Sequence, residues 1–261
     1  VLLNDPRFIL FLRNINSIDV SGVAIPKLIT KSKTGKTISL RANDSHLSNW
    51  LTFEDIEVKI TKDVKDAIKD DKAVPPKLKD VSSTKLNFVC QVVDDNITPV
   101  NPESSYLFSY LPTNVNDYKF PFLVNADFLT TANRQSIHSK NRWNLFLFEQ
   151  IGYNCIKWIA EIIESKVFLK SAYNLLPNIE NTMNDLPWQS FLSGFTKALE
   201  IENFILSKDE KLININDALY DKTGFSDYVV SEVFKNLISI NGDLISEKIK
   251  EAHPLISIIY K

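Results

Sequence analysis

The amino-acid sequence predicts an α/β (α+β) protein in which a mixed sheet with packed helices precedes a smaller C-terminal α/β segment. Up to about residue 128, the apolar residues form short runs typical of strands, some with the two-residue period of a half-buried strand. From Trp143 they recur every three or four positions, as on one face of an amphipathic helix. With 261 residues, 44% of them hydrophobic, the chain is long enough for one large core or two modest ones.

The first part of the chain is expected to be rich in strands. Asp5-Pro6 is typical of a helix start, and residues 8–12 form a short apolar helix or strand. Charged residues at helical spacing over 62–72, followed by Pro75-Pro76, predict an exposed helix. Strands are expected over residues 18–20, 24–30, 37–41, 50–60, 85–93, 105–111 and 120–128.

A long helix is expected from Trp143 to about Phe168, packed against the sheet through Phe148, Ile151, Cys155, Ile159 and Ile162. Beyond it we expect helices over residues 187–199, 226–238 and 243–252, with short apolar runs over 202–207 and 212–215. The predicted organisation is a first domain over 1–168, a connection rich in proline and asparagine over 169–187, and a smaller, mainly helical α/β segment over 188–261.

Composition argues against several classes of protein. A net charge of −2 does not indicate a nucleic-acid-binding protein. No apolar run reaches the roughly 20 residues of a membrane span, so a cytoplasmic protein without membrane contact is expected. Six isolated glycines cannot form a glycine-rich phosphate loop. Cys90 and Cys155 lie in apolar stretches and are expected to be reduced core thiols, and the histidines lack metal-site spacing, so no metal site is expected.

Two short motifs favour a structural interpretation over a chemical one. Thr34-Gly35-Lys36-Thr37 resembles the end of a phosphate loop but lacks its first glycine and lies between two expected strands. Residues 31–36 are therefore expected to be a hairpin loop. We expect the lysines in and beside this loop to be exposed to solvent. Contact with a phosphate backbone is the alternative for them: Lys27, Lys31, Lys33 and Lys36.

Arginine is rare in this lysine-rich chain, because only five of the 30 basic residues are Arg. Arg134 lies in the polar turn Thr130–Gln135, between an expected strand and the long helix that Trp143-Asn144 opens. A guanidinium on a polar loop at such a place is suited to contact an anion. Pairing with a nearby Asp or Glu, such as Asp127, is the alternative.

The stretch from residue 106 to 143 resembles the region that follows the ATP-binding domain in GHKL ATPases of the sacsin type. The elements that carry the likeness are Leu111-Pro112-Thr113, Val124 to Phe128, Ala132 to Gln135, and Trp143-Asn144. The segment from Phe8 to Ile15 is similar to the start of the same domain in that family. The resemblance covers about residues 1–168. It implies the fold of a GHKL transducer domain.

The same turn is more distantly similar to the middle-domain loop of the ninety-kilodalton heat-shock chaperones. The resemblance implies that Arg134 contacts the γ-phosphate of ATP held by the preceding domain, with Asn133, Gln135, His138 and Asp127 supporting the loop. Gln135 and His138 depart from the chaperone pattern, which more often has Glu and Gln there. ATP and Mg²⁺ are expected in the parent protein and no cofactor in this piece alone.

The first hypothesis is therefore a transducer, or middle, domain of a larger bacterial, cytoplasmic ATPase, either chaperone-like or part of a defence or nucleic-acid-processing system. The first residue is Val and not Met, so an excised fragment or a trimmed product is expected. The ATP-site motifs of the resembled family are missing from these residues, which implies that this piece does not hydrolyse ATP alone. Its expected partner is the upstream ATP-binding domain of the same chain, with a protein client and a homodimer left open. The alternative hypothesis is a protein-docking scaffold with no nucleotide role, and a stand-alone enzyme is a third.

Overall fold

The computed structural model describes residues 5–22, 27–179, 183–230, 232–233, 236 and 241–259. Their contacts divide the chain into two compact units, which we describe separately. The first contains the described residues of Val1–Phe148 and Thr182–Ser190, and the second those of Glu149–Asn181 and Phe191–Lys261. The predicted domain boundaries after residues 168 and 187 remain a prediction.

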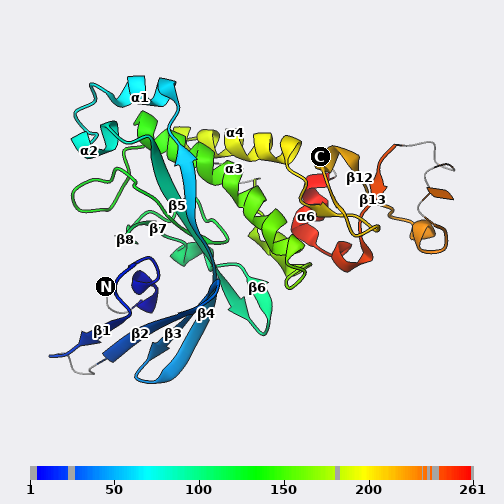
Figure 1. Ribbon diagram of the computed structural model, residues 1–261, viewed down its shortest axis with the longest axis horizontal. Coiled ribbons are helices and arrows are strands. Elements are labelled where there is room, and N and C mark those ends of the chain that lie inside the picture. Colours follow the sequence, from blue (N-terminus) through cyan, green and yellow to red (C-terminus); the bar gives the residue numbers. More distant parts are fainter. Residues whose placement is uncertain are drawn as a thin grey trace. The chain divides into compact units, whose positions relative to one another are not determined.

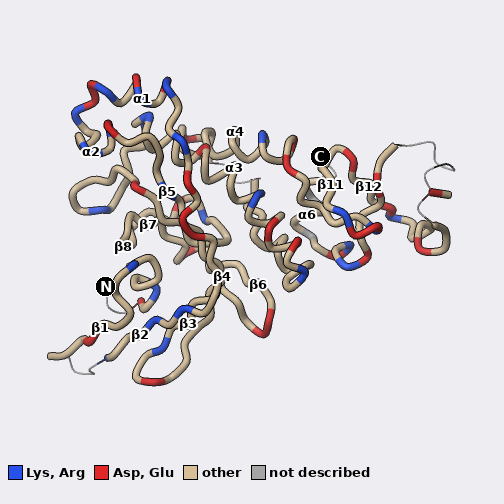
Figure 2. Tube along the Cα trace, in the orientation of Figure 1, with Lys and Arg blue, Asp and Glu red and all other residues tan. Residues whose placement is uncertain are grey.

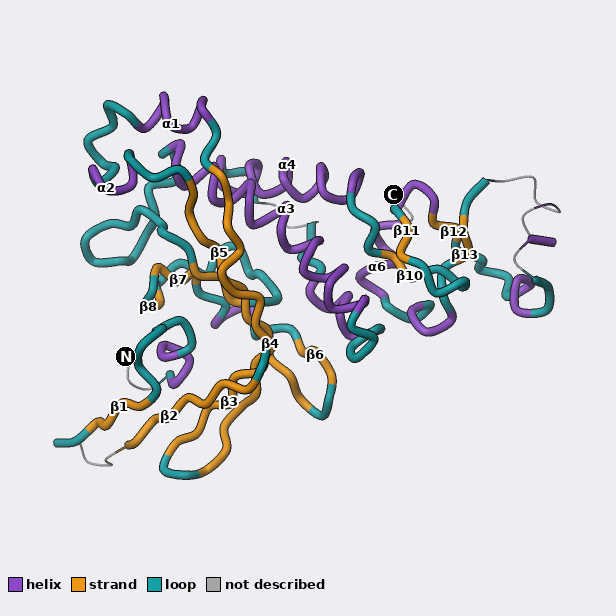
Figure 3. The backbone as a smooth tube through the Cα atoms, viewed as in Figure 1, coloured by secondary structure: helices purple, strands orange, loops and turns teal. Residues whose placement is uncertain are grey.

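The first unit is built on one mixed sheet, whose strands are orange in Figure 3. Its order among the described strands is β1-β2-β3-β4-β5-β9-β7-β8, with β6 paired to β5. The pairing of β7 with β9 is parallel and the others are antiparallel. The strands are β1 (Ser17–Val20), β2 (Lys27–Thr34), β3 (Thr37–Ala42), β4 (Ser45–Lys59), β5 (Ser83–Val93), β6 (Asn96–Thr98), β7 (Leu107–Ser109), β8 (Leu111–Pro112) and β9 (Leu123–Asn125). The predicted mixed sheet is confirmed.

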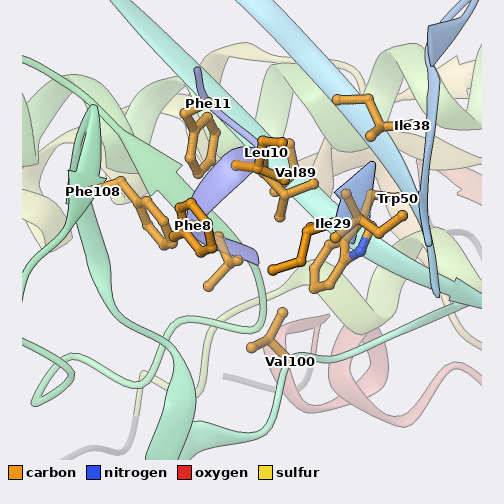
Figure 4. Packing of buried hydrophobic residues seen from close by; sticks show 12 residues of the cluster. Phe8, Leu10, Phe11, Ile29, Ile38, Trp50, Val89, Val100 and Phe108 are labelled. Carbon is orange, nitrogen blue, oxygen red and sulfur yellow. The ribbon is translucent and has the colours of Figure 1, made fainter. Parts of the chain in front are cut away.

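The chain before β1 packs on the sheet and completes a core. Asp5 caps the 3-10 helix Pro6–Ile9 by accepting a hydrogen bond from Arg7 N through Oδ1 at 3.0 Å, which confirms the predicted helix start. Phe8, Leu10 and Phe11 then lie against buried residues of the strands, as Figure 4 shows. That core also contains Ile9, Ile29, Ile38, Leu40, Trp50, Val89, Val100, Phe108 and Leu123. It covers the face of the sheet from β2 to β9.

Aromatic rings join the sheet to the helices within the first unit. The ring of Phe148, in the first part of α3 (Arg142–Glu164), lies 4.6 Å from Tyr118 and 5.8 Å from Phe128. Trp188, at the start of α4 (Leu186–Ile201), lies 6.2 Å from Phe120. The short helices α1 (Lys62–Ile68) and α2 (Pro76–Lys79) complete this unit (Figure 1).

In the second unit the later parts of α3 and α4 approach each other through glycine. A side chain at Gly152 would place its Cβ 2.1 Å from Phe191 O, and one at Gly194 would place it 1.8 Å from Glu149 O. Such distances are shorter than any van der Waals contact, so the two helix backbones touch because neither glycine has a side chain. The scarce glycines thus serve helix packing at these two positions.

Short strands and turns complete the second unit. The strands are β10 (Ile205–Leu206), β11 (Leu212–Ile213), β12 (Ala218–Leu219) and β13 (Asp243–Leu244), and a short helix, α6 (His253–Ile259), follows them. Tyr173, in the 3-10 helix Ser171–Leu175, is buried and donates its hydroxyl hydrogen to Phe204 O at 2.9 Å. The same hydroxyl accepts from Leu206 N at 3.2 Å, so it anchors β10.

The structure corrects several predicted elements. The expected loop over 31–36 is a two-residue turn at Gly35-Lys36, because the ladder between β2 and β3 continues to the pair Thr34 and Thr37. The expected strand over 105–111 breaks at Tyr110, whose φ is +64°. The expected strand over 120–128 is limited to β9. The predicted helix over 243–252 is wrong, since Leu244 pairs with Leu219 in a parallel ladder.

Other predicted elements are confirmed or refined. The long helix is confirmed as α3, and the helix predicted over 187–199 is α4. The helix expected over 62–72 is shorter, and it buries Val64 and Ile68, so it is not fully exposed. The beginning of the strand expected over 24–30 lies outside the described residues. The helix expected over 226–238 does not begin at 226, because Phe225–Asp227 is a 3-10 helix and residues 228–230 are not helical; several of its later residues lie outside the described part of the chain.

Two further expectations concern the thiols and membranes. Cys90 and Cys155 are both free and buried, as predicted, and burial raises the pKa of each thiol. Within the described part of the chain, none of the helices has both the length and the hydrophobicity that crossing a membrane requires.

The contact between α3 and α4 yields a stability prediction. We expect Gly194→Ala to lower the free energy of unfolding by about 3 kcal/mol or more, because the new Cβ must displace the backbone at Glu149. Gly35→Ala is the control. Gly35 has a φ of +59° and open space around it, so that only backbone strain of about 1 kcal/mol is added. Urea denaturation followed by circular dichroism measures both, and an equal loss in the two variants would contradict the close packing.

Candidate functional site

The polar turn that contains Arg134 is a well-formed loop between β9 and α3. Thr130 and Ile137 form an antiparallel bridge across its base. Thr131 N donates to Ser136 O at 2.9 Å, and Arg134 N donates to Thr131 O at 2.8 Å. Arg134 has a φ of +59°, a left-handed conformation that a non-glycine residue seldom adopts. The loop therefore holds Arg134 in one backbone geometry.

Trp143 and Asn144 fasten this loop to the first turn of α3. Asn144 is fully buried, and its side chain accepts from Leu129 N at 2.9 Å and donates to Leu129 O at 2.8 Å and to His138 O at 3.2 Å. Trp143 is also fully buried and donates from Nε1 to Asp127 O at 2.8 Å. The pair thus holds the main chain on both sides of the Arg134 turn.

The guanidinium of Arg134 reaches the hairpin of β7 and β8. Its Nη2 donates to Ser109 O and to Leu111 O, each at 2.8 Å. These carbonyls flank Tyr110, which is itself left-handed with a φ of +64° and has 51% of its surface exposed. In return, Arg134 O accepts from Asn114 N at 3.0 Å. Arg134 therefore clamps a strained hairpin tip.

No carboxylate among the described residues pairs with Arg134. Three of the other arginines do have such partners: Arg7 pairs with Asp5, Arg13 with Asp55, and Arg142 with Asp63. Arg41 is exposed, and no described residue forms an ion pair with it. Arg134 is half-buried, and its Nε is buried without a hydrogen-bond partner in the described part of the chain. Among the described residues, the carbonyl oxygens of Ser109 and Leu111 are the acceptors for the Arg134 guanidinium, and its charge is suited to an anion.

The predicted support residues divide into two groups. Asn133 and Gln135 belong to the turn itself, because Asn133 Nδ2 donates to Gln135 Oε1 at 2.9 Å and Asn133 Oδ1 accepts from Gln135 N at 3.1 Å. His138 acts through its main chain, donating to Leu129 O at 3.0 Å, and its exposed side chain lines a shallow depression with Asp71 and Lys140 among other residues.

Asp127 lies near the loop but has other partners. Its Oδ2 accepts from Thr84 Oγ1 at 2.9 Å. The negative charge of Asp127, the burial of Tyr110 and a hydrogen bond between the two side chains raise the pKa of Tyr110. The positive charge of Arg13 acts in the opposite direction. The alternative in which Asp127 neutralises Arg134 is therefore not found, and Asp127 instead stabilises the protonated phenol of the hairpin tip.

Sequence reasoning missed the hairpin tip and the bonds made by Asn144. Ser109, Tyr110 and Leu111 were expected to continue one strand, so their carbonyls could not be identified as partners of Arg134. The Leu111-Pro112 pair is the one available signal, since proline interrupts a strand ladder. The described residues contain no cluster of three His, Cys, Asp or Glu side chains able to hold a metal ion.

Comparisons with protein-family models, curated proteins and solved structures found no match to this chain.

The bonds of Asn144 yield a prediction for the loop. We expect Asn144→Ala to lower the free energy of unfolding by about 3 kcal/mol, because the N–H and C=O of Leu129 lose their partners in a buried site. Asn133→Ala is the control, since Asn133 is exposed and bonds only within its turn, and it should cost less than about 1 kcal/mol. Urea denaturation measures both values. Equal costs would mean that Asn144 does not hold the loop.

The left-handed backbone at Arg134 yields a second prediction. Arg134→Gly and Arg134→Ala remove the same guanidinium, but alanine keeps the steric cost of a positive φ. We expect the glycine variant to be more stable than the alanine variant by about 1 kcal/mol in thermal or urea unfolding. If alanine proves the more stable of the two, residue 134 does not have the left-handed conformation.

Proposed function

We propose that this chain is the transducer, or middle, part of a larger GHKL-type ATPase of the sacsin or heat-shock-chaperone kind, and that Arg134 contacts the γ-phosphate of ATP bound by an upstream domain. The observation that carries the proposal is the charge of Arg134. Among the described residues it is the half-buried arginine without a carboxylate partner, on a loop held by several internal hydrogen bonds.

The guanidinium has the chemistry that this role needs. Nη2 is used by the carbonyls of Ser109 and Leu111, and no described residue accepts a hydrogen bond from Nη1. A planar guanidinium keeps its charge at any physiological pH and can direct several N–H groups toward phosphate oxygens. At a transferring γ-phosphate, such a cation stabilises the charge that develops in the transition state.

The same contacts provide a route for the nucleotide state to reach later parts of the chain. If Arg134 turns toward a phosphate, Ser109 O and Leu111 O lose a donor on either side of the left-handed Tyr110. The loop is also bonded through Asn144 to α3, which continues to Glu164. A change in the loop would therefore act on the hairpin and on a long helix. Ligand-dependent switches use side chains that, like Arg134 in this proposal, have two alternative sets of contacts.

Under this proposal, the upstream domain of the same chain supplies ATP and Mg²⁺. A protein client or a second copy would be the downstream partner, and the parent protein would act in the cytoplasm as a chaperone-like, defence or nucleic-acid-processing ATPase.

The test is ATP turnover by a polypeptide that is extended upstream to include the encoded neighbouring domain. We expect Arg134→Ala to lower kcat on the order of tenfold or more, equivalent to about 1.4 kcal/mol per decade. ADP affinity should stay unchanged, because ADP lacks the γ-phosphate. Arg134→Lys should recover only part of the rate, since Lys lacks the planar fork. Arg41→Ala, at an exposed arginine, is the matched control and should keep the wild-type rate.

Two outcomes would overturn the assignment. Full ATP turnover with alanine at position 134 would show that the loop is structural. An extended wild-type protein that neither binds nor hydrolyses ATP would favour the protein-docking scaffold.

A further inference from the structure

Two lysines of β2 lie on the face of the sheet that elsewhere carries the core. Successive strand residues point to opposite faces, so Lys31 and Lys33 share a face with the fully buried Ile29. Directly opposite residues of paired strands also share a face, and these lysines pair with Leu40 and Ile38, which are buried. Charged residues at core-facing positions cost stability, and such exceptions to the pattern tend to mark functional sites.

These lysines line a cleft in the first unit, which we call the Lys31 cleft. Its volume is about 220 Å³. Leu10, Phe11 and Ile38 form apolar walls continuous with the core drawn in Figure 4. The polar and charged lining consists of Arg13, Asn16, Lys31, Lys33, Glu54, Asp55 and Asn87. Figure 2 shows the basic residues along β2.

The charges of the cleft are paired with one exception. Arg13 Nη2 lies 3.0 Å from Asp55 Oδ1, and Lys33 forms an ion pair with Glu54. Lys31 forms no ion pair with any described residue, and its Nζ donates to Leu12 O at 2.5 Å. An ammonium has three hydrogen-bond donors, so at least one remains for a ligand.

The surroundings of Lys31 disfavour the charged form of its amine, which a bound anion would stabilise. Burial lowers the pKa of Lys31, Glu54 acts in the opposite direction, and Lys33 adds to the lowering. An anion beside the amine would favour its charged form and would compensate for part of the lost hydration.

Glu54 and Asp55, which also line the cleft, lie at a bulge in β4. The register between β4 and β5 shifts between Phe53 and Ile56, and Asp55 within it has a φ of +55°. Asp55 N donates to Asn87 Oδ1 at 2.8 Å, while its carboxylate bonds Lys85 and Arg13. The bulge therefore directs Glu54 and Asp55 to the cleft in a fixed geometry, as bulges near functional sites do.

We propose that the Lys31 cleft binds a small monocarboxylate with a short apolar chain, its carboxylate on the Lys31 ammonium and its chain against Leu10, Phe11 and Ile38. The lining carries three cations (Arg13, Lys31 and Lys33) and two carboxylates (Glu54 and Asp55), and this net charge of +1 matches a single negative charge. A phosphate dianion fits less well, because Glu54 and Asp55 would repel it. The apolar walls add affinity for each methylene that they cover. This inference is independent of the proposed ATPase role.

The test is an amide NMR titration of the chain with butyrate, butylamine and inorganic phosphate as probes. We expect butyrate to give saturable shifts at the amides of Lys31, Asp55 and Asn87, and the other two probes to give none there. Lys31→Met should weaken butyrate binding on the order of tenfold, since it removes a charge-assisted hydrogen bond. Lys59→Met, at an exposed lysine of β4, is the matched control and should leave binding unchanged.

A chemical readout on the wild-type chain keeps the test valid if Lys31→Met fails to fold. Butyrate should slow acylation of Lys31 by an amine-reactive ester, relative to Lys59, when both sites are followed by mass spectrometry. Equal acylation of Lys31 with and without butyrate would overturn the proposal. Stronger binding of phosphate than of butyrate at these amides would also overturn it, as would unchanged butyrate affinity in a folded Lys31→Met variant.

Discussion

The side chain of Asn144 is the constraint on which the candidate site depends. It is buried at the start of α3 and uses both its acceptor and its donor on the main chain of Leu129 and His138. A buried amide is stable only when such bonds are complete, so the helix start and the loop must form together. Trp143 adds the bond to Asp127 O. The polar turn thereby becomes a defined platform for Arg134.

Arg134 and Tyr110 show how strain is concentrated on this platform. Both have a left-handed backbone, and the guanidinium of one bonds the two carbonyls that flank the other. A left-handed conformation costs about 1–2 kcal/mol at each such residue. Strain of this kind persists only where neighbouring contacts impose it, and it often accompanies a residue with more than one functional position. This makes the hairpin tip, rather than Asp127, the natural partner of Arg134 in the absence of an anion.

The main helices and strands could be predicted from the sequence, whereas the backbone conformations at the candidate site could not. The period of three and four that includes Phe148 predicted α3, and the β-forming run of β5 predicted a central strand. The break at Tyr110 escaped prediction because an exposed tyrosine adopts a positive φ only when distant contacts hold it. The half-burial of Lys31 escaped for a similar reason, since the residues before β1 that cover it pack there only in the tertiary structure.

Arg134 and Lys31 are two cations left uncompensated in different ways, and the difference decides what each can bind. Arg134 sits on a hydrogen-bonded loop with unused N–H groups of a planar fork, the geometry that matches several phosphate oxygens. Lys31 is a compact charge in a cleft that is also lined by apolar side chains and two carboxylates. Repulsion from those carboxylates grows with the charge of the ligand, whereas no described carboxylate forms an ion pair with Arg134. Under the two proposals, carboxylates line the site of the cation that takes a monocarboxylate, and none forms an ion pair with the cation that takes a polyphosphate.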